Sequence, residues 1–327
     1  MRLPRWKKEQ KQRKEKKRFR LARNLFLLIC LALLLGTSYQ AWGSLRKSLW
    51  DGKSRLTFAL NSTSILVASF DPGEKTLNFL SIPPNTYIET IHGYGFYKVE
   101  SIFRLGELEK NGGQLLAGSL QEYLGVPIDA YASVSSVKCQ VSSIKVKDSF
   151  LAVIQFLLRG EGETNLTRWD LVRLWWGARR VRFDKINLID LGETNAVSET
   201  TLPDGTLALE PDPLRLDQLV AKLYSDRRIK EEGISISVHN STQYPGLAKK
   251  AARLINNIGG QVIEVRDWQV RAGKCEVRGE KKSVNTYTAR KLIKIFACQY
   301  GGSQMGESQG EIAVILGQDY WQKLMEK

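Results

Sequence analysis

The sequence predicts an α/β fold in three parts: a single N-terminal transmembrane helix, a central-sheet α/β sandwich domain, and a smaller β-α-β-β-α-β domain. An apolar segment stands next to a strongly basic N-terminus. Beyond it, short apolar runs alternate with segments whose apolar residues recur at helical spacing, which is typical of helices packed on a sheet. The chain of 327 residues, 43% of them hydrophobic, is long enough for about two packed domains after a targeting segment.

Positive charge is concentrated at the N-terminus. Residues 1–24 contain 12 Lys or Arg and 2 Asp or Glu, a balance of +10 out of +15 for the whole chain. Such a block is typical of a solvated arm that binds nucleic acid or anionic lipid. It adjoins an apolar segment and has no helix-turn-helix pattern, so we expect a cytoplasmic arm and no nucleic-acid partner.

Residues 25–42 are expected to cross the membrane. Leu25–Gly36 is continuously apolar, and Thr37–Trp42 extends it to about 18 residues, or roughly 27 Å of helix. A cleaved signal peptide is the alternative, because the strictly apolar core has only about 12 residues. No small-x-small cleavage pattern follows cleanly, so we predict an uncleaved anchor in the cell membrane, with the N-terminus cytoplasmic and the bulk of the chain extracytoplasmic.

A polar stalk at residues 43–55 leads to the first globular domain, expected at 56–192. Ile65–Ala68 and Leu77–Leu80 have the composition of buried strands around the turn Asp71-Pro72-Gly73. A helix is predicted where Leu115, Leu116, Leu120, Tyr123 and Leu124 fall at helical spacing. A second helix is predicted from Thr167, with Thr167 as N-cap and Asp170 at the third position.

Residues 193–232 contain three prolines and an Asp-Gly pair, and they are predicted to be a linker or edge segment. A second domain is expected at 233–327. Its predicted elements are a strand at Ile234–Val238, a helix with Leu247 to Ile258 on its apolar face, a strand at Val262–Val265, a helix at Ala289–Phe296 and a buried strand at Ile312–Leu316.

The heptapeptide Leu80–Thr86 (LSIPPNT) follows the second predicted strand, and Lys98-Val99-Glu100 and Gly125–Tyr131 come after it. This order resembles the LytR-CpsA-Psr family, membrane-anchored enzymes that transfer glycopolymers from a polyprenyl-phosphate carrier to the bacterial cell wall. Residues 233–321 likewise resemble the C-terminal domain that often follows in LytR-type proteins. The resemblances imply a polyprenyl-phosphate lipid or wall polymer as partner, with a further protein partner possible through the C-terminal domain.

The residues that carry charge in the family pattern are replaced here. In the family, the heptapeptide has an Arg that grips pyrophosphate and an Asp that helps to hold a divalent cation; these positions are Pro84 and Asn85. A second cation ligand aligns with Thr63. The interval from Val134 to Thr164 is also short and retains only Arg159, where the family has an arginine-rich insert. A hard dication prefers carboxylate oxygens, so no metal site is predicted.

The remaining site candidates are few. Ser81, Asn85 and Lys98 are predicted to bind ligand, and Lys98, Glu100 and Arg104 are the candidates for any surviving catalysis. We expect a cell-envelope protein that binds a lipid-linked glycan, wall polymer or partner protein without full transferase chemistry. An active Mg²⁺-dependent phosphotransferase with a relocated site is the alternative, and a DNA-binding regulator is a more distant one.

Four cysteines leave the pairing open. Cys30 lies in the apolar segment, which leaves an odd number in the rest of the chain: Cys139, Cys275 and Cys298. Their spacing matches no metal site. Cys275 and Cys298 can either form a disulfide outside the membrane or remain buried thiols.

Overall fold

The computed structural model describes residues 36, 47–134, 145–268 and 271–325. The predicted basic arm and membrane anchor lie outside these residues. Within them, no helix has the length and apolar character needed to cross a membrane. The described residues from Leu49 onward, apart from 167–169, form one compact unit. This unit is a mixed α/β structure with several sheets.

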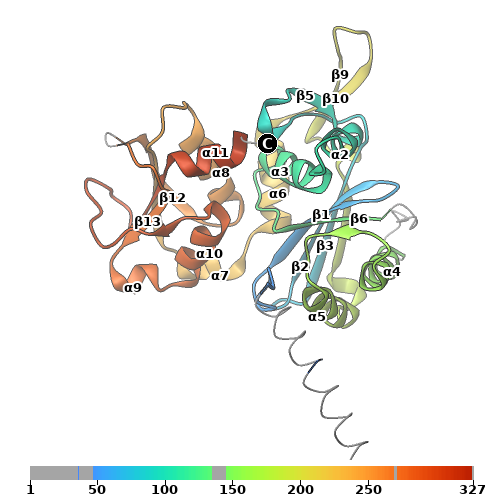
Figure 1. Ribbon diagram of the computed structural model, residues 1–327, viewed down its shortest axis with the longest axis horizontal. Coiled ribbons are helices and arrows are strands. Elements are labelled where there is room, and N and C mark those ends of the chain that lie inside the picture. Colours follow the sequence, from blue (N-terminus) through green and yellow to red (C-terminus); the bar gives the residue numbers. More distant parts are fainter. Residues whose placement is uncertain (1–35, 37–46, 135–144, 269–270, 326–327) are drawn as a thin grey trace, which may run out of the picture. The chain divides into compact units, whose positions relative to one another are not determined.

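A six-stranded mixed sheet forms the first part of this unit, in the order β7-β6-β1-β2-β3-β8 (Figure 1). The strands are β1 (Leu56–Asn61), β2 (Ile65–Asp71), β3 (Thr76–Ile82), β6 (Ala130–Ser133), β7 (Glu163–Thr164) and β8 (Ile186–Asp190). The first three strands are antiparallel neighbours, while β6 and β8 run parallel to β1 and β3. The strands predicted at Ile65–Ala68 and Leu77–Leu80 are confirmed as β2 and β3.

Helices cover both faces of this sheet because alternate residues of its strands are apolar on each face. On one face, Phe58, Leu66 and Phe79 join the core made with α4 (Val146–Arg159) and α5 (Arg168–Arg179). On the other face, the core includes α2 (Val99–Glu107), α3 (Gly112–Leu124) and α6 (Pro213–Tyr224). The helix predicted from Leu115 to Leu124 is confirmed as part of α3, and Gly125 ends it in a left-handed conformation.

Short elements connect these layers. They are β4 (Tyr87–Glu89), η1 (Ile91–Gly93), β5 (Phe96–Lys98), η2 (Phe183–Lys185), η3 (Leu191–Glu193), β9 (Val197–Thr201), β10 (Leu207–Pro211) and α7 (Arg227–Glu232). The segment predicted as a linker therefore contains a hairpin and helices. Its α6 contributes Leu216, Val220 and Tyr224 to the core, so this segment is part of the packed fold.

Asp170, in the first turn of α5, ties this helix to the residues before β1. It is completely buried, and its carboxylate accepts hydrogen bonds from the backbone N–H groups of Leu49 (3.2 Å) and Trp50 (3.4 Å). Arg173, one turn further along, donates to the carbonyl of Trp50 (3.1 Å). These hydrogen bonds hold Leu49 and Trp50, at the start of this compact unit, against α5.

A five-stranded sheet organises the C-terminal part, in the order β12-β11-β15-β13-β14. Its elements are β11 (Ser235–Asn240), α8 (Leu247–Asn257), β12 (Gln261–Asp267), β13 (Glu276–Gly279), α9 (Lys281–Val284), α10 (Tyr287–Phe296), β14 (Gln299–Tyr300), β15 (Ile312–Leu316) and α11 (Gln318–Met325). The order β-α-β-β-α-β is present, with β14, α9 and α11 in addition. Apolar residues of α8 and α10 pack with those of β11, β13 and β15 in one core.

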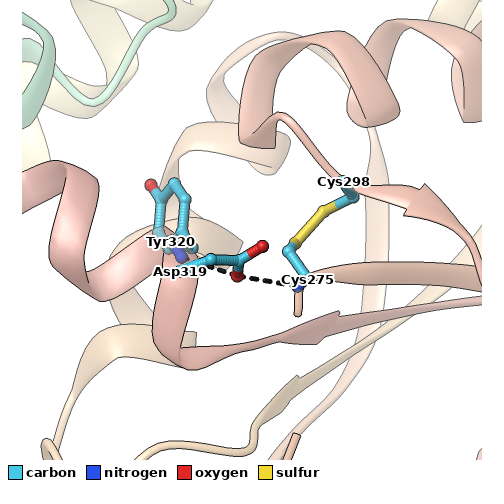
Figure 2. The surroundings of a disulfide bond; sticks show 4 residues. All are labelled: Cys275, Cys298, Asp319 and Tyr320. Carbon is cyan, nitrogen blue, oxygen red and sulfur yellow. Dashed lines mark hydrogen bonds between the residues drawn. A yellow bond between two sulfur atoms is a disulfide. The ribbon is translucent and has the colours of Figure 1, made fainter. Parts of the chain in front are cut away.

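Cys275 and Cys298 form a disulfide between the residue before β13 and the residue before β14 (Figure 2). The backbone N–H of Cys275 donates to the carboxylate of Asp319, which lies at the start of α11 and also accepts from the N–H of Tyr320, both at 2.7 Å (Figure 2). Of the two alternatives left open by the sequence, the structure therefore shows the disulfide and not two free thiols.

Candidate functional site

The heptapeptide Leu80–Thr86 ends β3 and turns toward α2. The N–H of Thr86 donates to the carbonyl of Pro83 (3.1 Å), which closes a turn with Pro84 and Asn85 at its centre. Proline suits the first central position because its φ is already fixed near the required value. The carbonyls of Thr86 and Pro84 accept hydrogen bonds from the first N–H groups of α2, those of Val99 (2.9 Å) and Glu100 (3.4 Å). The turn thus holds the N-terminus of α2 in place.

A pocket of about 780 Å³ opens beside this turn. Three segments form it: the loop between β1 and β2, the turn at Pro84, and α2. Its described lining residues are Asn61, Ser62, Thr63, Ser64, Ile65, Pro84, Glu100, Ser101, Phe103, Arg104, Glu107 and Ser133. Both Thr63 and Pro84, the positions where the family pattern has Asp and Arg, are therefore in its wall.

One face of α2 supplies the charges of this pocket. Glu100, Phe103, Arg104 and Glu107 follow one another at the spacing i, i+3, i+4, i+7, which places them on the same side of a helix. The opposite side is buried through Val99 and Ile102. Two carboxylates and one guanidinium give the described lining a net charge of −1.

The rim opposite α2 is made of uncharged polar groups. Ser62 donates through its hydroxyl to the carbonyl of Ser64 (3.1 Å), and the amide of Asn61 donates to the hydroxyl of Ser133 (3.2 Å). The hydroxyl of Ser64 is buried and has no hydrogen-bond partner among the described residues. A buried hydroxyl of this kind is stabilised when a ligand or water bonds to it. The described lining of the pocket therefore offers hydrogen-bonding groups together with a single cation.

Of the predicted site residues, Glu100 and Arg104 line this pocket, and the other three do not. Ser81 is buried in β3 beside Leu66 of β2, on the sheet face that α4 and α5 cover. Asn85 is the second central residue of the turn, and its carbonyl accepts from the N–H of Leu209 (3.2 Å) in β10. Both residues therefore have structural contacts outside the pocket.

Lys98 directly precedes α2 and faces the hairpin of β9 and β10. The N–H and hydroxyl of Thr206 lower the pKa of the Asp204 carboxyl in that hairpin, and the charge of Lys98 contributes to the same shift. Lys98 is not among the residues that line the pocket. The three candidates for catalysis therefore do not all converge on one groove.

The sequence reading missed Ser62, Ser64, Phe103 and Glu107 as pocket residues. The helical spacing from Glu100 to Glu107 was the available signal for the last two. The alignment of Thr63 with a family cation ligand was the signal for the loop at 62–64, although its contact with α2 depends on the pairing of β1 and β2. The described residues contain no group of three or more His, Cys, Asp or Glu placed to hold a metal ion.

Comparison with known proteins identifies the domain around this pocket. Residues 33–137 match the LytR_cpsA_psr family model. The chain carries a LytR_cpsA_psr family domain. Thr63, Pro84, Glu100 and Arg104 all lie within these residues, so the pocket belongs to the family domain. The resemblance read from Leu80–Thr86 is confirmed, whereas that of residues 233–321 to a LytR-type C-terminal domain stays a prediction.

Solved structures give a weaker similarity. TagT of B. subtilis is 16% identical over 53% of this chain and 91% of its own, with a TM-score of 0.40. The structure of TagT with bound octaprenyl pyrophosphate is 17% identical over 53% of this chain and 90% of its own, with a TM-score of 0.39. A transcriptional regulator from Enterococcus faecalis is 12% identical over 64% of this chain and 89% of its own, with a TM-score of 0.41. Similarity at this level carries no argument about single residues. No curated protein sequence matches the chain.

Proposed function

We propose that this protein works in cell-envelope glycopolymer assembly, where it binds a polyprenyl-phosphate-linked glycan at the pocket beside Pro84 without catalysing its transfer. We further propose that the chain is anchored in the cell membrane by residues 25–42, with the family domain outside the cytoplasm. The family domain at 33–137 supports the role in the envelope. The observation that carries the binding function is the pocket itself, which keeps the motif positions of the family but changes their chemistry.

The pocket suits a ligand with one phosphate and neighbouring sugar hydroxyls. Arg104 is exposed at the pocket and forms no ion pair with any described residue, so its guanidinium is available for a phosphate oxygen. Ser62, Thr63 and Ser64 line the same space, where their polar groups can bond to sugar or phosphate oxygens. Ile65, Pro84 and Phe103 add apolar surface for the first units of a prenyl chain.

Transfer of the glycan requires more positive charge than the described lining of this pocket holds. The leaving and attacking oxygens of a phosphoryl group share negative charge, which enzymes neutralise with several cations or a metal ion. Loss of one such group typically costs about 10² or more in rate. Here the family's Arg position is Pro84, its cation-ligand positions are Thr63 and Asn85, and the described lining is net negative. We therefore infer binding with little or no turnover.

The alternative function is a Mg²⁺-dependent phosphotransferase with a relocated site. It is favoured by one observation, the presence of Glu100 and Glu107 in the pocket wall on the same face of α2. Two carboxylates of this kind can supply oxygen ligands to Mg²⁺. The bound cation would neutralise their negative charge, so that a phosphate could bind beside them. The two functions differ in their dependence on magnesium.

Binding and turnover can be measured on the full chain in detergent micelles. A polyprenyl-diphosphate-linked sugar is the substrate for turnover, and the corresponding polyprenyl monophosphate is the probe for binding, each with Mg²⁺ and with EDTA. We expect binding in both conditions and no release of carrier phosphate above background. Arg104→Ala should weaken binding by about tenfold or more, since a hydrogen bond to a charged group contributes about 1.5–3 kcal/mol. Lys249→Ala, an exposed cation on α8, is the matched control.

Magnesium-dependent turnover at the rate of an intact family member would refute the binding-only proposal. If Glu100→Gln then abolished this turnover, the relocated site would be on α2. If Arg104→Ala and Lys249→Ala had the same binding affinity, the pocket would not be the phosphate site.

A further inference from the structure

One exposed face of α5 combines aromatic and basic side chains. Val172, Trp176 and Arg179 follow at i, i+4 and i+7, so they share one side of the helix, and Arg180 directly follows its last residue. All four are exposed, with Val172 at 43% and Trp176 at 52%. The opposite side of α5 is buried in the core through Leu171, Leu174 and Ala178. The exposed face is therefore not needed for the packing of the domain.

The segment after α5 continues this composition. Arg182, Phe183 and Lys185 are exposed, and Phe183 shows 66% of its surface to solvent. Residues 172–185 contain five Lys or Arg and one Asp, a net charge of +4. Asp184 is paired with Arg182 at 3.1 Å, which leaves the other cations in excess. We call Val172, Trp176, Arg179, Arg180, Arg182, Phe183 and Lys185 the α5 surface.

Cations and rings are in direct contact on this surface. The guanidinium of Arg180 lies over the ring of Trp176 at 4.4 Å from its centroid. The ammonium of Lys147, a buried residue of α4, lies over the ring of Phe183 at 5.1 Å from its centroid. A Trp ring beside an Arg is suited to the boundary between lipid headgroups and acyl chains, where the ring is partly desolvated and the cation remains near phosphate.

The length of the connecting chain limits the distance between the α5 surface and the predicted membrane anchor. Leu49 and Trp50 are hydrogen-bonded to Asp170 and Arg173 of α5. Only six residues, 43–48, separate Leu49 from Trp42, the end of the predicted anchor, and this stretch of chain spans at most about 25 Å when fully extended. With residues 25–42 in a bilayer, this length of chain leaves the start of α5 within reach of the membrane.

We propose that the α5 surface docks on the headgroups of a bilayer that contains anionic phospholipid, and that this contact holds the family domain at a fixed orientation to the membrane. The inference rests on the proposed membrane anchor. A soluble polyanion would be attracted by the cations alone, whereas Trp176 and Phe183 add exposed apolar area that only a lipid phase would bury. The observations therefore favour a membrane over a soluble anionic polymer.

Brominated lipids quench tryptophan at the membrane boundary, so they test this contact on the full chain. The protein is reconstituted in nanodiscs of zwitterionic lipid, alone or mixed with anionic phosphatidylglycerol, with and without bromine on the acyl chains. The signal of Trp176 is the difference between the wild type and Trp176→Phe. We expect bromine to quench this difference signal by more than half in the anionic discs and to quench it less in the zwitterionic ones.

Charge-reversal variants show whether the basic residues hold the contact. Arg179→Glu/Arg180→Glu should remove most of the quenching in anionic discs, and Arg179→Gln/Arg180→Gln should give an intermediate value. Lys281→Glu/Lys282→Glu reverses two exposed charges of α9 and is the matched control, which should quench as the wild type does. Thermal unfolding of each variant confirms that the fold is retained.

Three results would overturn the proposal. The first is a Trp176 signal that bromine does not change in anionic discs. The second is an equal loss of quenching in the charge-reversal variants of α5 (Arg179→Glu/Arg180→Glu) and of α9 (Lys281→Glu/Lys282→Glu). The third is protection of Trp176 from an aqueous quencher by a soluble anionic wall polymer, when anionic discs give no such protection. Failure of the chain to stay with the discs after carbonate extraction would instead refute the anchor, so the two failures are distinguishable.

Discussion

Acidification should destabilise the C-terminal part through one buried histidine, His239. Its side chain is completely buried in β11, and its Nε2 lies 2.7 Å from the hydroxyl of Ser308. Burial lowers the pKa of His239 to about 4, although the nearby carboxylate of Glu264, 3.9 Å away, acts in the opposite direction. The folded protein therefore keeps this imidazole neutral at pH values where the unfolded chain protonates it.

The size of this effect follows from the two pKa values. The unfolded pKa is 6.5 and the folded pKa about 4, and one pKa unit corresponds to about 1.36 kcal/mol. The stabilisation is fully present above pH 6.5, because both states are then neutral, and it is lost as the pH falls toward 4. Of the total of about 3 kcal/mol, roughly 2 kcal/mol should be lost between pH 7 and pH 5.

Denaturant unfolding at a series of pH values measures this loss. The chain has two histidines, so His92→Gln is the matched control for His239→Gln. We expect His92→Gln to lose stability between pH 7 and pH 5 as the wild type does, and His239→Gln to lose much less. The carboxyls with lowered pKa values, such as Glu232 and Glu264, contribute only below about pH 4.5. An NMR titration of His239 with a midpoint near 6.5 would contradict the reasoning.

Two further changes test the packing. Serine at both Cys275 and Cys298 should lower the free energy of unfolding by about 3 kcal/mol, because the disulfide closes a loop with a sequence separation of 23; an unchanged denaturation midpoint in oxidising buffer would contradict this. Gly113→Ala should destabilise by about 1–3 kcal/mol, because its Cβ would lie 2.1 Å from the ring of Tyr131. The control is Gly118→Ala in the same helix, because a Cβ at that position meets the flexible end of the Ile91 side chain. Equal denaturation midpoints for the two variants would contradict a rigid contact at Tyr131.

The elements that the sequence predicted well are those with continuous apolar patterns. β2, β3, α3, α8, α10 and β15 each bury most of one face or both, so the spacing of their apolar residues is set by the core. The hairpin of β9 and β10 and the helix α6 were missed because prolines and an Asp-Gly pair dominate residues 193–213. In α6, Pro213 begins the helix and Asp212 caps it, so these residues mark its start.

The site was predictable only in part. Glu100 and Arg104 could be named from the sequence because they follow the family motif, and the structure places both in one pocket wall. Thr63 could be linked to the site only through the family alignment, and its neighbours Ser62 and Ser64 were not named, since the strand pairing that forms this loop is not visible in a local pattern. Lys98, adjacent in sequence to the pocket residues, faces the β9–β10 hairpin because it precedes the first turn of α2.

The central claim, that the pocket beside Pro84 binds a polyprenyl-phosphate ligand, is tested most directly by photolabelling. A polyprenyl phosphate with a photoreactive group next to the phosphate is irradiated with the full chain, and the labelled peptides are identified by mass spectrometry. We predict label in the loop at residues 61–65 and on α2 between Glu100 and Glu107, reduced in Arg104→Ala and unchanged in Lys249→Ala. Label confined to other segments, or equal label in the two variants, would contradict the account.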